Sequence, residues 1–118
     1  EGSTCELVRC LIKKPCVVSV KRGDKIESNE LDVIRCFKSE MRFFDTVKDH
    51  ECLINRIGIM HGDNLILEYY PSRTLWDIIE NGIDINKFKY SWYQQLQKAV
   101  THIHSFNLSH GDISPVNI

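Results

Sequence analysis

Three polar residues near the end of the sequence have types and a spacing that suit proton transfer and metal binding. Asp112 follows His110 by two positions, and Asn117 follows that aspartate by five. A carboxylate and an amide at this separation can converge on one point, where the first accepts a proton from a hydroxyl group and the second offers oxygen to a hard metal ion. An ordinary turn after a helix would explain the same residues, so the preceding elements must distinguish the two interpretations.

Composition and charge exclude several classes of partner. The 118 residues include 15 Lys and Arg against 16 Asp and Glu, with both signs interspersed and a formal net charge of -1. This balance argues against binding to nucleic acid or to a charged membrane surface. No stretch is long and apolar enough to span a bilayer. The start of the sequence has neither Met nor a basic and apolar leader, so it tells nothing about targeting.

The cysteines favour an intracellular (cytoplasmic) protein. Their number is odd, and no C-x-x-C pair with matching ligands is present, so neither a disulfide framework nor a zinc site is indicated. We expect reduced thiols at all five positions, which are Cys5, Cys10, Cys16, Cys36 and Cys52.

Two β-prone runs and a long helical pattern open the chain. Residues 6–12 and 16–21 predict strands, and residues 22–25 predict a turn. From residue 29 to residue 47 the period becomes helical. Glu40 lies on this helix beside its apolar stripe, from which its carboxylate can reach a neighbouring strand. The stripe consists of Leu31, Ile34, Phe37, Met41, Phe44 and Val47.

A hairpin follows the long helix. Residues 56–60 and 65–70 are apolar runs on either side of the turn at residues 61–64. The second run is almost wholly apolar as far as Glu68, so we expect a central, buried strand.

Two further helices are predicted before the closing loop. Thr74 and Asp77 resemble a capping box that opens a short helix at residues 75–80. A longer helix is expected from residue 87 to residue 106. Its apolar stripe consists of Phe88, Trp92, Leu96, Ala99 or Val100, and Ile103.

The order of these elements and motifs resembles that of protein kinases along essentially the whole chain. Val18-Ser19-Val20-Lys21 resembles the V-A-I-K strand, whose lysine holds the α- and β-phosphates of ATP. Glu40, nineteen positions after Lys21, matches the helix glutamate that pairs with that lysine and fixes its ammonium group. His110, Asp112 and Asn117 match the catalytic loop H-x-D-x-x-x-x-N. On this match Asp112 is the base that orients the acceptor hydroxyl, and Asn117 is a magnesium ligand.

The resemblance also implies a nucleotide site, with ATP and Mg²⁺ as cofactors. Gly2 matches the middle glycine of the kinase Gly-rich loop, Leu7 matches the apolar residue after it, and Cys5 stands in the third glycine's position. Ser19 replaces the alanine that packs on adenine. The strand and hinge that border the adenine would consist of Leu67, Glu68, Tyr69 and Tyr70.

A kinase-like chain of this kind is an α+β protein. Residues 1–70 would form a small antiparallel β-sheet lobe with one long helix. Residues 71–118 would form the start of an α-helical lobe, with two helices and the catalytic loop. The implied activity is ATP-dependent phosphoryl transfer to Ser or Thr of a protein substrate.

Two departures in the loop affect the choice of acceptor. Gly111 replaces the arginine usually found between the histidine and the aspartate, so a phosphorylated activation loop would lack its customary basic partner. Ser114 replaces the lysine typical of serine/threonine kinases. H-G-D followed by a small residue and Pro also resembles aminoglycoside and choline phosphotransferases, which share the fold. A small-molecule acceptor is therefore an alternative.

No D-F-G motif follows the loop before Ile118, so the aspartate that holds the principal magnesium has no counterpart in the sequence. Because phosphoryl transfer depends on positioning and charge neutralisation, we expect little or no transfer by this polypeptide alone. The other interpretation is a non-catalytic kinase mimic, a pseudokinase that binds a kinase or its substrate. In either case the last helix predicts a protein partner or self-association through Phe88, Trp92, Leu96 and Ile103.

Overall fold

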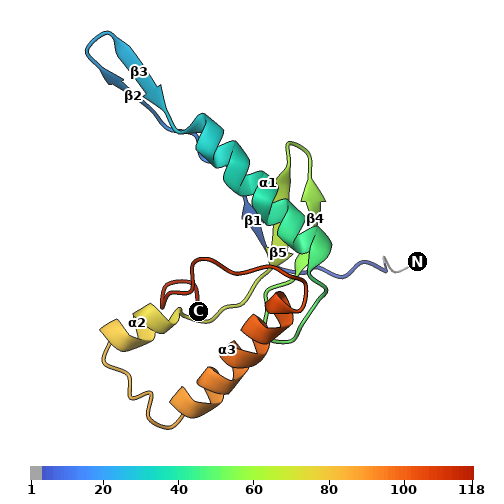
Figure 1. The fold of residues 1–118 in the computed structure, drawn as a ribbon. Helices are drawn as coiled ribbons and strands as arrows, with labels where there is room; N and C mark the ends of the chain where they lie inside the picture. The colour runs from blue at the N-terminus through green and yellow to red at the C-terminus, as the bar shows by residue number, and fades with distance from the viewer. Residues whose placement is uncertain (1–3) are drawn as a thin grey trace. The chain divides into compact units, whose positions relative to one another are not determined.

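The computed structural model describes residues 4–118, which form two compact units (Figure 1). The first unit comprises the chain up to Lys48 together with Asn55–Tyr69, and the second comprises Asp49–Ile54 and Tyr70–Ile118. Antiparallel sheets are combined with helices, which confirms the predicted α+β class.

The first unit contains a three-stranded antiparallel sheet with β5 at its centre. β5 (Asn64–Glu68) pairs with β1 (Cys10–Lys13) on one side and with β4 (Arg56–Met60) on the other. Leu65 and Leu67 of β5 are buried, which confirms that the apolar second strand of the hairpin is central. Burial of these two side chains supplies the core of the sheet.

Helix α1 (Glu30–Thr46) forms where the helical period predicts it, but its apolar stripe is packed only in part. Val47, at the end of the stripe, is buried, whereas Leu31 near the start is 70% exposed. Arg56 of β4 donates from Nη2 to Asp45 Oδ1 at 2.6 Å, which ties the last turn of α1 to the sheet.

Two more strands follow β1 in the sequence and precede α1. β2 (Ser19–Arg22) and β3 (Lys25–Ser28) form an antiparallel ribbon beyond the N-terminal end of α1 (Figure 1). Gly23 has a φ of 62° in the turn, a conformation that glycine adopts readily. Asn29 joins the ribbon to α1, since its Oδ1 accepts from Val18 N at 2.7 Å and its own amide donates to Val18 O at 3.2 Å. The sequence predicts the turn but not β3.

The second unit contains two helices. α2 (Leu75–Glu80) has the predicted bounds and begins with the predicted capping box. α3 (Lys89–His104) starts two residues later and ends two residues earlier than expected, and Ala99 and Ile103 on its inner face are buried. These two residues form the small core of this unit.

Within residues 4–118, no helix combines the length and the apolar character needed to cross a bilayer. All five cysteines lie in this range, and they are not joined in disulfides.

Candidate functional site

The first unit holds a close ion pair between β1 and α1. Lys13, the last residue of β1, donates from Nζ to Glu40 Oε1 at 2.7 Å and to Glu40 Oε2 at 2.8 Å. The side chains of Lys13 and Glu40 are 47% and 27% exposed, so solvent reaches the pair and screens it in part. Two carboxylate oxygens on one ammonium group fix the position of a positive charge beside the sheet.

This geometry corrects the predicted partner of Glu40. The sequence predicts a pair between Glu40 and Lys21, but Lys21 lies on β2, opposite Ile26 of β3, and Glu40 pairs with Lys13 instead. The physical reason is strand pairing, because β1 and not β2 is hydrogen-bonded to β5. The missed signal is Cys10-Leu11-Ile12-Lys13, which is also an apolar run that ends in lysine.

Two other residues before α1 that are predicted to contact nucleotide, Ser19 and Leu7, lie outside the three-stranded sheet. Ser19 lies on the ribbon opposite Ser28, so it is not in the strand beside β5. In β1, Leu11 lies two positions before Lys13, as Ser19 lies two positions before Lys21. Leu11 pairs with the buried Leu67 of β5. Leu7 is 98% exposed, and residues 4–9 form no strand. Gly2 lies outside the described residues, so its predicted role stays a prediction.

The residues predicted for the hinge continue directly from β5. Leu67 is 4% exposed, and Glu68 ends the strand with its Oε2 accepting from Asn55 N at 3.3 Å. Tyr69 and Tyr70 follow and are exposed. The chain passes from the first unit to the second after Tyr69. The roles of these residues in nucleotide binding stay predictions.

In the second unit Asp112 and Asn117 converge, as their spacing predicts. Asn117 donates from Nδ2 to Asp112 Oδ2 at 2.9 Å and to Asp112 O at 3.0 Å. Asp112 N in turn donates to His110 Nδ1 at 3.2 Å. Gly111 has a φ of 79°, a conformation that side-chain-bearing residues rarely adopt, and it turns the chain between the histidine and the aspartate.

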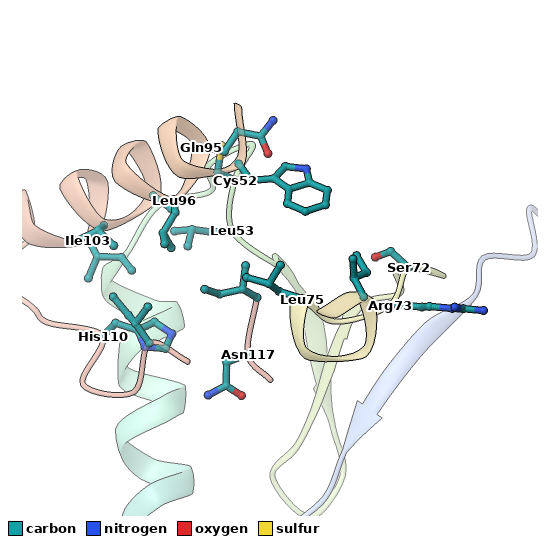
Figure 2. Close-up of a pocket in the computed structure, with 16 residues that line it drawn as sticks. Cys52, Leu53, Ser72, Arg73, Leu75, Gln95, Leu96, Ile103, His110 and Asn117 are labelled. Carbon is teal, nitrogen blue, oxygen red and sulfur yellow. The ribbon is translucent and has the colours of Figure 1, made fainter. Parts of the chain in front are cut away.

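An apolar cavity of about 410 Å³ lies beside this loop in the second unit (Figure 2). His110 and Asn117 border it, and in the figure the amide end of Asn117 points away from Leu53 and Leu96. Most of the predicted α3 stripe also lines the cavity, with Trp92, Leu96, Ala99, Val100 and Ile103.

The stripe therefore faces a hollow within its own unit over most of its length. Phe88, at its start, stacks on Trp92 with ring centroids 5.6 Å apart and remains 48% exposed. Self-association or partner binding through this face stays a prediction.

The loop offers hard oxygen atoms that suit magnesium. With its nitrogen bonded to Asp112, Asn117 presents its Oδ1 as a neutral oxygen ligand, and carboxylate and amide oxygens are the donor types that Mg²⁺ accepts. No group of three or more His, Cys, Asp and Glu side chains suited to a metal ion occurs among residues 4–118. Asp112 and Asn117 could thus supply some of the oxygen ligands of a magnesium ion, and the phosphates of a nucleotide would supply others.

Comparison with protein-family models gives a match to the protein kinase domain over residues 1–118, which is the whole chain. A comparison with solved structures gives no significant match.

Proposed function

Since the chain belongs to the protein kinase domain family, we propose that it binds ATP with Mg²⁺ and supports phosphoryl transfer to a Ser or Thr hydroxyl of a protein. The family in general uses these two cofactors. The observation that carries the proposal is the ion pair of Lys13 with Glu40, which holds an ammonium group between a strand and a long helix.

In the first unit Lys13 takes the role that the sequence assigns to Lys21. A lysine ammonium is a compact charge that suits phosphate oxygens, and a fixed ammonium loses less freedom on binding than a mobile one. Because nearly half of the Lys13 side chain is exposed, a phosphate group can reach it without breaking the bonds to Glu40. Leu11, beside Leu67, replaces Ser19 as the proposed apolar contact for the adenine ring.

In the second unit Asp112 is the proposed base and Asn117 the proposed magnesium ligand. The bond from Asn117 Nδ2 orients one carboxylate oxygen of Asp112, and the other oxygen can accept a hydrogen bond from an acceptor hydroxyl. Bound Mg²⁺ supplies charge neutralisation on the phosphates. The residues of the chain hold and orient the reacting groups.

Thermal unfolding with and without ATP and Mg²⁺ tests the proposal, with two lysine variants as a matched pair. We expect the nucleotide to raise the Tm of the parent chain and of Lys21→Ala, because ligand binding to the folded state stabilises it. We expect no nucleotide-dependent rise for Lys13→Ala, since only Lys13 is held by Glu40.

Each contrary result has a defined meaning. A parent Tm that does not respond to ATP would overturn nucleotide binding and favour the non-catalytic kinase mimic. Loss of the response in Lys21→Ala, with the response kept in Lys13→Ala, would return the role to Lys21. Labelled phosphate from ATP, followed onto an acceptor, separates binding from turnover.

A small-molecule acceptor is the second candidate, and the conformation of Gly111 favours it. A φ of 79° is strained for any residue with a side chain, so the loop itself disfavours the arginine common in protein kinases at this position. Parallel transfer assays with a Ser/Thr-rich protein, an aminoglycoside and choline distinguish the candidates. We expect any label to be greater on the protein than on either small molecule, and label on only a small molecule would reverse that choice.

A further inference from the structure

The first two backbone amides of α2 are bonded to the closing loop. Leu75 N donates to Ile118 O at 2.7 Å, and Trp76 N donates to Pro115 O at 2.9 Å. Amides in the first turn of a helix have no partner within the helix, so they are available to hold another segment. Here the two acceptors lie on either side of Asn117, and the backbone of that residue is therefore held from both directions.

Held in this way, Asn117 controls the orientation of Asp112. Its backbone amide donates to Ser114 O at 2.9 Å, and its side chain donates to both the carboxylate and the carbonyl of Asp112. A shift in the backbone on either side of Asn117 would move the amide nitrogen away from Asp112 Oδ2. The orientation of both side chains thus depends on the two α2 amides.

The capping box fixes the direction of those amides. Asp77 N donates to Thr74 Oγ1 at 3.2 Å, while Asp77 Oδ2 accepts from Thr74 Oγ1 at 2.8 Å and from Thr74 N at 3.0 Å. The bond from the Thr74 hydroxyl, followed by that from its backbone amide, holds the pKa of the Asp77 carboxyl below its usual range. A helix of six residues is too short to persist alone, so its first turn depends on this cap.

We infer that Thr74 and Asp77 are positioning residues for Asp112 and Asn117, acting through the amides of Leu75 and Trp76. The catalytic meaning of this role rests on the proposed function, whereas the mechanical link does not. Neither Thr74 nor Asp77 would touch substrate or nucleotide in this role. Their contribution is to fix the direction of one carboxylate oxygen and one amide oxygen at the loop.

Replacement of Leu75 tests the link with little change to the cap. Leu75→Pro removes the N–H that donates to Ile118 O, and proline suits the first position of a helix. Thr74, with φ −68° and ψ 159°, already has the extended conformation that a residue before proline requires. Leu75→Ala is the matched control, because it removes the side chain that lines the cavity and keeps the N–H.

The readout is hydrogen exchange of the Asn117 side-chain amide in a ¹⁵N-labelled full chain, with its signals assigned from their loss in Asn117→Asp. We expect Leu75→Pro to speed this exchange by about five- to tenfold, the equivalent of one lost hydrogen bond, relative to Leu75→Ala. Thr74→Val should also speed the exchange of the Asn117 side-chain amide. Thr74→Ser, which keeps the hydroxyl, should exchange within about twofold of the parent rate. Backbone amides of α3 report that the unit stays folded.

Equal Asn117 exchange rates in Leu75→Pro and Leu75→Ala would overturn the link. If Thr74→Val unfolds α2, the proline variant still decides, because the capping box is intact in it. No nucleotide is added, so failure of ATP binding would overturn the proposed function without affecting this result.

Discussion

The two units hold their polar pairs by different means. In the first, Lys13 and Glu40 lie 27 positions apart on a strand and a helix, so their contact depends on how β1 and α1 pack. In the second, Asp112 and Asn117 lie five positions apart in one loop and are bonded directly. Displacement of a whole element can therefore break the first pair, whereas the second is broken only by a change within the loop or at its α2 anchor.

The largest expected effect comes from a change in the core of the first unit, which holds Lys13 and Glu40. Leu65→Ala removes a fully buried side chain from β5 and should lower the free energy of unfolding of this unit by about 2–5 kcal/mol. Backbone hydrogen exchange should rise in β1, β4 and β5 and much less in α3. Ile59→Ala is the control, because Ile59 faces Leu65 across the strands but is 48% exposed. Equal loss of protection in α3 would show that the two units unfold together.

A smaller change in the second unit gives the reciprocal test. Ile103→Val removes one methylene group from a side chain that is 1% exposed, and we expect a loss of about 0.5–1.5 kcal/mol. Faster exchange should appear in α3 and spare β5. Ile79→Val on α2, where the side chain is 47% exposed, should change stability by less than about 0.5 kcal/mol. Loss of protection in β5 would contradict the separation of the units.

The same contrast explains which features the sequence could reveal. The contact of Asp112 with Asn117 and the bounds of α2 follow from short spacings and a local cap, so they were predictable. The choice between Lys13 and Lys21 was not, because both end apolar runs and only the pairing of β1 with β5 selects one. β3 was not predicted because the strand has only four residues, Lys-Ile-Glu-Ser, and most of them are polar.

A double-mutant cycle measures how much the pair in the first unit contributes to stability. Because Lys13 is nearly half exposed, the coupling between Lys13→Ala and Glu40→Ala should be below about 1 kcal/mol. It should fall further as salt is raised. Lys21→Ala, combined with Glu40→Ala, serves as the control and should show no coupling. A larger coupling for Lys21 than for Lys13 would contradict the ion pair observed here.

The smallest expected effect concerns acid and the anchor of the second pair. Hydrogen bonds from Thr74 lower the pKa of Asp77 in the folded state, so the contribution of this carboxylate is present above the pKa of the unfolded chain and is lost as the pH falls through the lower folded value. We therefore expect the Asp77 backbone amide, which donates to Thr74 Oγ1, to shift in NMR spectra below about pH 4. Asp77→Asn should lack this step. If the Asn117 side-chain signals follow this step in the parent but not in Asp77→Asn, acid loosens the loop through α2. The same Asn117 behaviour in both proteins would limit the cap to the helix itself.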